Sequence, residues 1–253
     1  MNEETLTTQQ NRRDFLKTTA VVAGITVAPG VLLYGVSQAK PADEPASLKK
    51  RWGMLIDTNK CADGCDDCVK ACVNEHGLRK DTRPEDTRPD VAAQWIRKVG
   101  LRDKQTGKEF SLPLLCQHCE HPPCVDVCPT GASFKRVDGI VLVDKHICIG
   151  CRYCMMACPY KARSFIHETL ENQKPYSPRG KGTVESCTFC VHRVDNDQKP
   201  ACVEACSQAD HKAMVFGDMN DPNSEIHQKL KEINSTTLRP DMQLNPGVRY
   251  QGL

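Results

Sequence analysis

Residues 148–159 read Cys148-Ile149-Gly150-Cys151-Arg152-Tyr153-Cys154-Met155-Met156-Ala157-Cys158-Pro159, so two, two and three residues separate four cysteines that precede a proline. The chain has 253 residues and sixteen cysteines, and every cysteine falls into one of four compact quartets. One cubane iron–sulfur cluster takes four thiolate ligands, so four quartets predict four [4Fe–4S] clusters. The quartets are Cys61, Cys65, Cys68, Cys72; Cys116, Cys119, Cys124, Cys128; Cys148, Cys151, Cys154, Cys158; and Cys187, Cys190, Cys202, Cys206.

The spacing within this run has a physical reason. Three cysteines that are two residues apart can surround one corner of a cluster within a tight turn of backbone. The fourth, three residues further on, points away along a short helix and reaches a neighbouring cluster, as in bacterial two-cluster ferredoxins. The quartets are therefore expected to work in pairs.

Continuity along the chain suggests the pairing. The second and third quartets are neighbours and both end in Cys-Pro, at Cys128-Pro129 and Cys158-Pro159, which leaves the first and fourth for each other. Under the crossed rule, each fourth cysteine joins the three leading cysteines of its partner quartet. The predicted ligand sets are Cys61, Cys65, Cys68 and Cys206 (cluster 1); Cys187, Cys190, Cys202 and Cys72 (cluster 2); Cys116, Cys119, Cys124 and Cys158 (cluster 3); Cys148, Cys151, Cys154 and Cys128 (cluster 4).

Three other interpretations of the cysteines stay open at this point. An even count in an exported chain is also typical of disulfides, and Cys-x2-Cys pairs also build tetrahedral zinc sites. The spacing of Cys61, Cys65 and Cys68 matches that of radical S-adenosylmethionine enzymes, whose cluster keeps one iron without a protein ligand. Neither disulfides nor zinc would require the repeated quartet.

The N-terminus contains a different signal. Asn11-Arg12-Arg13-Asp14-Phe15-Leu16-Lys17 precedes an uncharged run from Thr18 to Ala39. Adjacent arginines before Phe-Leu-Lys are typical of a twin-arginine export signal, so we expect a signal peptide over 1–39, cleaved after Ser37-Gln38-Ala39. A retained membrane helix is the alternative, because the run is long enough to span a bilayer. Since no second apolar run of that length follows, we expect a periplasmic domain that reaches a membrane only through a partner.

Composition sets the charge and the size of the core. The formal charge of +2 counts every cysteine as neutral, whereas each oxidised cluster with its four thiolates adds about −2, which brings the loaded protein to about −6. With only 5% aromatic residues, the clusters must replace part of the apolar core, so the chain without iron is expected to unfold. Cations near ligand cysteines are expected to offset cluster charge: Lys60, Lys70, Lys145, Arg152, Lys161 and Arg163.

Candidate residues beyond the cysteines are few. Four histidines stand next to ligand cysteines and could donate hydrogen bonds to a cluster, although packing or exposure is the simpler interpretation. The sequence contains neither a nucleophile with a base nor a glycine-rich phosphate loop, so we expect no catalytic residues and no nucleic-acid partner. The histidines are His118, His121, His146 and His192.

Short strands and helices are expected around each quartet, which predicts an α+β fold. Strands are expected at 54–57, 94–99, 109–114, 140–143, 162–167 and 213–216, with 94–99 and 109–114 forming a hairpin. Helices are expected at 66–75 and from about Asp221 or Ser224 to Asn234, a surface excursion over 79–90, and an irregular segment at the end of the chain.

These elements predict two nested, pseudo-symmetric ferredoxin-like units. The outer unit combines 51–108 with 170–217 and carries the first and fourth quartets, while the inner unit, 109–169, carries the second and third. A linker over 40–50 precedes them, and 218–253 forms a C-terminal helix and tail.

Three segments carry a family resemblance: 116–132, which contains Cys116-Gln117-His118-Cys119; 139–144; and 148–160. Together they closely resemble the four-cluster subunits of complex iron–sulfur molybdoenzymes and their relatives. That family includes the electron-transfer subunits of dimethyl sulfoxide, tetrathionate, polysulfide and nitrite reductase systems. The resemblance implies a non-catalytic subunit that passes electrons through four [4Fe–4S] clusters.

Three further segments, 51–57, 179–190 and 247–253, look most like the DsrO group of periplasmic iron–sulfur subunits. This resemblance implies a membrane complex linked to sulfur metabolism. The implied partners are an NrfD-type integral membrane subunit that handles quinone, a multihaem cytochrome c and other Dsr subunits. The alternatives are a beta subunit of a tetrathionate or polysulfide reductase or of a hydrogenase, and a catalytic reductase of sulfur compounds.

Overall fold

The computed structural model describes residues 46–78, 92–170 and 173–253. The chain divides into two units, 1–39 and 40–253. The predicted signal peptide and the predicted excursion over 79–90 lie outside the described residues. In the described part, every helix is too short or too polar to cross a membrane.

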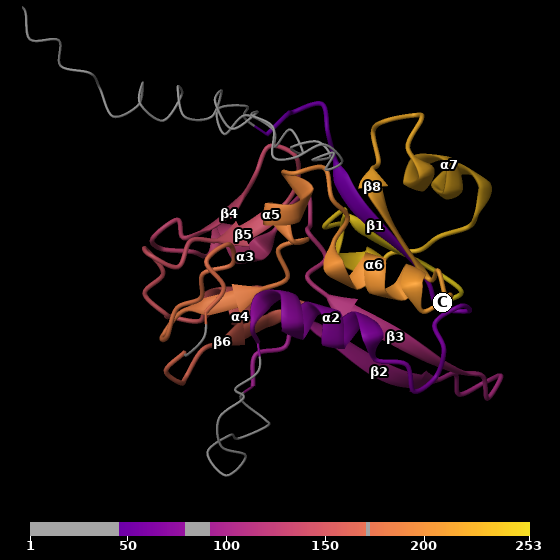
Figure 1. The fold of residues 1–253 in the computed structure, drawn as a ribbon, viewed down its shortest axis with the longest axis horizontal. Helices are drawn as coiled ribbons and strands as arrows, with labels where there is room; N and C mark the ends of the chain where they lie inside the picture. Colours follow the sequence, from indigo (N-terminus) through magenta and orange to yellow (C-terminus); the bar gives the residue numbers. More distant parts are fainter. Residues whose placement is uncertain (1–45, 79–91, 171–172) are drawn as a thin grey trace, which may run out of the picture. The chain divides into compact units, whose positions relative to one another are not determined.

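A three-stranded sheet contains both ends of the described chain. Strand β1 (Trp52–Asp57) lies between β8 (Met214–Asp218), to which it is antiparallel, and β9 (Val248–Gln251), to which it is parallel (Figure 1). The predicted strands over 54–57 and 213–216 are therefore confirmed. The predicted irregular end is wrong, because β9 occupies it.

The central strand, β1, carries apolar residues on both of its faces, so both faces of the sheet are packed against other parts of the chain. Met54 and Ile56 are fully buried in the core that contains the cysteines. Leu55 points to the other face, where it packs with Val215 and with Ile226 of a C-terminal helix. Alternate residues of one strand therefore belong to two different cores.

That helix, α7 (Glu225–Glu232), confirms the predicted C-terminal helix. The hydroxyl of Ser224 caps it by accepting the backbone N–H of His227 at 3.2 Å. A Cβ on Gly217 would lie 3.1 Å from the Ile226 side chain, so glycine lets the helix approach the sheet closely.

The predicted hairpin is confirmed with a regular register. Strand β2 (Ile96–Arg102) pairs antiparallel with β3 (Glu109–Leu115), from Ile96 opposite Leu115 to Arg102 opposite Glu109. Asp103 opens the connecting turn, where its carboxylate accepts the backbone N–H of Gln105 at 2.7 Å.

Within the described residues, two small antiparallel sheets and six short helices complete the fold, and the mixed content agrees with the α+β class. Helix α2 packs against α6, as Figure 1 also shows, and α3 packs against α4. The strands are β4 (Ser133–Lys135) with β5 (Val141–Val143) and β6 (Arg163–Phe165) with β7 (Val184–Ser186); the helices are α2 (Asp67–His76), α3 (Pro123–Asp126), α4 (Tyr153–Ala157), α5 (Val191–Val194), α6 (Ala201–Gln208) and the 3-10 helix η3 (Pro240–Met242).

Candidate metal centres

Every quartet occupies the same local setting. Its leading cysteines follow a strand, and its later cysteines lie on or beside the short helices that come next. The strands that lead into the four quartets are β1, β3, β5 and β7, in chain order. Gly150 shows why the loops need special backbone, because its φ is +71° and a Cβ there would lie 2.2 Å from the carbonyl oxygen of Gly182.

Thiols of the two outer quartets lie side by side in two groups. Burial raises the pKa of Cys68 to about 12, and the nearby thiols of Cys61, Cys206 and Cys65 contribute to this shift. Cys206 comes from α6, more than a hundred residues further along the chain. The fourth cysteine of the last quartet, Cys206, therefore lies near the three leading cysteines of the first quartet.

The second outer group gathers around Cys72 on α2. Burial raises the pKa of Cys187 well above its usual value, and Cys72, Cys202 and Cys190 reinforce the shift. The pKa of Cys72 is raised in the same way by burial and by Cys190. Packing of α2 against α6 brings these segments together.

The inner quartets show the same exchange of fourth members. Burial raises the pKa of Cys116 to about 12, and Cys124 and Cys158 contribute. Burial also raises the pKa of Cys119 to about 12, again with Cys124 and Cys158 nearby. Cys158 ends the third quartet but lies with the leading cysteines of the second.

A cavity marks the remaining inner group. It is lined by Cys128, Cys148, Cys151 and Cys154, together with Gly150 and other residues. The volume between these residues, open solvent included, is about 310 Å³. Cys151 is exposed, whereas Cys154 is buried. The four thiols therefore surround a space at the surface of the molecule.

Clustered thiols with raised pKa values are suited to hold a cationic metal group. A coordinated metal reverses the effect of burial, because its charge keeps the bound thiols ionised. All sixteen cysteines are free thiols in the structure, so the disulfide interpretation finds no support.

The spacing of the sulfurs separates iron–sulfur clusters from zinc. Zinc at about 2.3 Å from each sulfur of a tetrahedron would hold neighbouring sulfurs about 3.8 Å apart. Among the described residues, only Cys65, Asp67 and His211 place three such ligand atoms within 4.8 Å of one another. The quartet sulfurs are therefore spread more widely than around one ion, as a multi-atom cluster requires.

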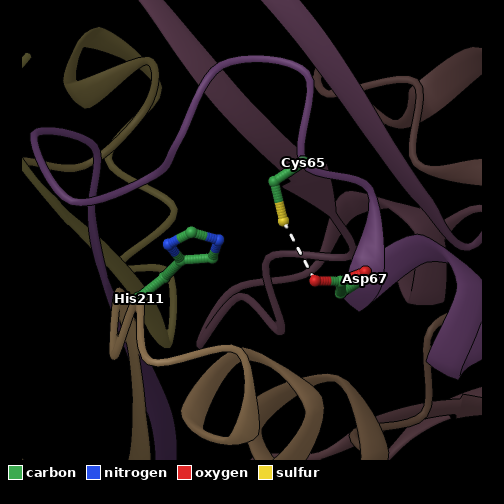
Figure 2. Close-up of side chains that lie close together, drawn as sticks. All are labelled: Cys65, Asp67 and His211. Carbon is green, nitrogen blue, oxygen red and sulfur yellow. Dashed lines mark hydrogen bonds between the residues drawn. The ribbon is translucent and has the colours of Figure 1, made fainter.

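Figure 2 shows Cys65, Asp67 and His211, a group that the sequence did not reveal. The thiol of Cys65 donates to Oδ2 of Asp67 at 3.4 Å, and the ring of His211 approaches from the loop after α6. Cys65 also lies beside Cys61 and Cys68, with Cys206 close by. Cys206 thus supplies a fourth thiol beside these three cysteines, whereas a radical S-adenosylmethionine site has only three.

Of the four histidines considered in the sequence, His118 has the most informative setting. It is fully buried, and its Nδ1 accepts the backbone N–H of Val141 at 3.0 Å, while its Nε2 has no protein partner. Its ring stacks on Phe189 with centroids 3.7 Å apart. Phe189 stands between Cys187 and Cys190, so this ring pair joins the loops of the second and fourth quartets.

The other three histidines fit the simpler interpretation of packing or exposure. His192 contacts Glu75 at 2.8 Å rather than a thiol, and His121 and His146 are exposed. His76, which sequence reasoning missed, is buried and places its Nε2 3.3 Å from the Cys190 sulfur. Only folding brings His76 there, because 114 positions separate the two residues.

Cations near the thiols also come from unexpected segments. Lys98 on β2 reaches the first loop and donates to the carbonyl oxygens of Ala62, at 3.0 Å, and Cys65. Among the predicted cations, Arg163 is buried, while Lys60 and Lys70 are exposed and form ion pairs with Asp57 and Asp66.

Comparison with known proteins identifies the family of the chain. Two segments, 60–132 and 108–219, match the family described as "4Fe-4S dicluster domain". The chain is 42% identical to the Hdr-like menaquinol oxidoreductase iron-sulfur subunit 1 of Archaeoglobus fulgidus, over 96% of this chain and 98% of the relative.

Two other relatives have similar coverage. A tetrathionate reductase subunit of Salmonella typhimurium is 37% identical over 96% of this chain and 88% of its own. Protein NrfC of Escherichia coli is 37% identical over 88% of this chain and 86% of its own. Two dicluster domains correspond to four [4Fe–4S] clusters, and the two matched segments contain all sixteen cysteines. The chain therefore belongs to the family of four-cluster iron–sulfur electron-transfer subunits.

Proposed function

We propose that the four groups of neighbouring thiols are the ligand sets of the four clusters. Cluster 1 takes Cys61, Cys65, Cys68 and Cys206; cluster 2 takes Cys187, Cys190, Cys202 and Cys72. Cluster 3 takes Cys116, Cys119, Cys124 and Cys158; cluster 4 takes Cys148, Cys151, Cys154 and Cys128. The neighbourhood of Cys158 with Cys116 and Cys119 is the single observation that carries this crossed assignment. The two pairs then form nested outer and inner ferredoxin-like units.

The subunit itself is non-catalytic in this proposal. Every cluster receives four thiolates, so no iron has an open position for a substrate. Electrons enter at one end of the set of clusters and leave at the other. The chain serves a membrane complex in which an NrfD-type integral subunit exchanges electrons with quinone. The relative named as a menaquinol oxidoreductase subunit supports a quinone-linked role.

Cluster 4 is the best placed to face a partner. Cys151 is the exposed cysteine of the sixteen. Four apolar residues within five positions of it in the chain are also exposed, the last at 75%: Ile147, Ile149, Tyr153 and Met156. We call these four residues the apolar collar. Large exposed apolar side chains that gather in one place mark an interaction site. The membrane subunit would cover the collar and shield the cluster from water.

More specifically, the subunit belongs in this proposal to a Dsr-type complex of sulfur metabolism on the periplasmic side. A multihaem cytochrome c is its redox partner there. The sequence resemblance of 51–57, 179–190 and 247–253 and the twin-arginine motif support this part. The second candidate is a beta subunit of a tetrathionate reductase, favoured by the 37% identity to a tetrathionate reductase subunit over 96% of the chain. The proteins that copurify with the chain distinguish the two.

Iron analysis and paired substitutions test the ligand sets. Anaerobically purified protein is expected to hold about sixteen iron atoms. The double variant Cys116→Ala/Cys158→Ala removes two ligands of one cluster in the crossed scheme, so electron paramagnetic resonance should show one altered cluster. Two altered clusters would contradict the crossing. Cys116→Ala/Cys128→Ala is the matched control, which is expected to alter two.

Membranes from a strain that produces the tagged chain test the role in a complex. Added menaquinol is expected to reduce the clusters in intact membranes, and a quinone-site inhibitor should block this reduction. An NrfD-type protein should copurify with the chain. A fully loaded protein that stays unreduced by menaquinol and copurifies without a membrane protein would contradict the proposal.

A further inference from the structure

We infer that Arg163 raises the reduction potentials of the inner pair, clusters 3 and 4, by placing its buried positive charge near both and an N–H donor on a thiolate of cluster 3. The inference rests on the proposed ligand sets. Arg163 begins β6, five residues after Cys158, and its residue exposure is 5%.

Contacts of the guanidinium place it at the inner thiols. Nη2 donates to the sulfur of Cys124 at 3.0 Å and to the hydroxyl of Ser133 at 2.8 Å. Its charge also acts on Cys116 and Cys154, where it opposes the rise in pKa that burial causes. Cys124 and Cys116 belong to cluster 3 and Cys154 to cluster 4, so one cation serves both clusters.

Two of its nitrogens lack a protein acceptor, and a bound cluster would supply one. Nε and Nη1 are buried without a protein hydrogen-bond partner. A guanidinium has five N–H donors, and leaving buried donors unpaired is costly. The sulfide and thiolate sulfurs of iron–sulfur clusters accept hydrogen bonds. The free donors are therefore those expected of a residue that contacts bound clusters.

Arg163 also differs from Arg179, another buried arginine of the described chain, in the kind of negative group that lies beside it. Arg179 pairs with the carboxylate of Glu185 at 3.0 Å. For Arg163, the strongest charge partners are the thiols of Cys124, Cys116 and Cys154. Because a buried charge needs a partner, the anionic clusters are the natural counter-ions for Arg163.

The effect on potential has a definite sign. On taking up one electron, a cluster with four thiolates goes from about −2 to about −3. A nearby cation and N–H donors stabilise the more negative form more strongly, so they raise the potential. Removing them should make the inner clusters harder to reduce.

Redox titration of the loaded full-length protein tests this inference. Arg163→Gln and Arg163→Lys are titrated with mediators and followed by electron paramagnetic resonance. In Arg163→Gln, the reduced-to-oxidised ratio of at least one inner cluster at fixed potential should fall about tenfold, which is about 59 mV for one electron. Arg163→Lys should shift in the same direction by less, while the outer clusters stay unchanged.

Two controls separate this role from a structural one. Ser133→Ala removes the hydroxyl partner of Arg163 but leaves the Cys124 contact. Arg97→Met removes a guanidinium that donates to the carbonyl oxygens of Tyr160 and Lys161. Both variants should keep the inner potentials close to those of the unaltered protein.

A measurement on the unaltered sequence covers the case in which variants lose iron. Protein with nitrogen-15-labelled arginine, once reduced, should show a nitrogen coupling to an inner cluster in pulsed resonance spectra. Unchanged inner potentials in loaded variants, or the absence of that coupling, would overturn the role of Arg163. Wrong ligand sets would instead show in the paired alanine variants, so the two failures are distinguishable.

Discussion

The hydroxyl of Tyr250 joins the C-terminal strand to the segment that leads into the second quartet. It donates to the carbonyl oxygen of Pro113 at 3.1 Å and accepts from Nε2 of Gln117 at 3.0 Å. Tyr250→Phe leaves these buried groups short of a partner, so it should lower the free energy of unfolding by about 1–3 kcal/mol. Anaerobic denaturant unfolding measures the loss. Tyr176→Phe, at a half-exposed position, should cost much less, and equal losses would contradict the prediction.

Arg179 and Glu185 form a buried ion pair. Arg179 contacts Glu185 at 3.0 Å, with side-chain exposures of 5% and 0%, and also donates to the carbonyl oxygen of Gly77, which caps α2, at 2.7 Å. Arg179→Met leaves a buried carboxylate unpaired and should cost about 3–5 kcal/mol of unfolding free energy. The lost stability is measured as a fall in the temperature at which the protein loses its clusters. Arg239→Met, which breaks the exposed pair with Asp241, should leave that temperature unchanged.

Among the elements, α7 depends on the residue that precedes it. The Ser224 hydroxyl caps the helix and also donates to the carbonyl oxygen of Asp218 on β8. Ser224→Ala should reduce the free energy of unfolding by about 0.5–2 kcal/mol. Lys231→Ala, exposed on the same helix, is the control and should change it little. A similar loss in both variants would argue against the cap.

Strands and helices with a local signal were predictable from the sequence. The hairpin of β2 and β3 is continuous in the chain, and β1 is an apolar run that ends before a cysteine loop. Strand β9 was missed because its partner, β1, lies almost two hundred residues away and pairs with it in parallel. Short segments that pair at such distance have no periodic pattern to indicate them.

At the scale of the whole molecule, the core is built partly from metal ligands. Each of the four quartets contains buried cysteines, and several of these belong to the main apolar cluster. Because metal binding is then part of folding, an anaerobic chelator should abolish cooperative unfolding and most of the far-ultraviolet circular dichroism. Protein incubated without chelator is the control. A cooperative transition in iron-free protein would contradict this.

The apolar collar predicts how the protein attaches to its complex. Ile149→Glu/Met156→Glu places charge beside the exposed Cys151 and should release the protein from membranes while its iron content stays unchanged. Leu101→Glu alters an exposed apolar residue on the β2–β3 hairpin and should leave binding intact. Retention of the collar variant on membranes would show that the partner binds elsewhere.

The number and kind of clusters follow from the amino-acid sequence alone, because ligand count and the spacing of cysteines within a loop are local properties of the chain. It also predicted the crossing of quartets. Three features became visible only in the folded chain: which thiols lie side by side, the burial of Arg163 against Cys124, and the exposure of Cys151. These features depend on contacts between segments far apart in the chain, such as α2 with α6, whose packing no local pattern encodes.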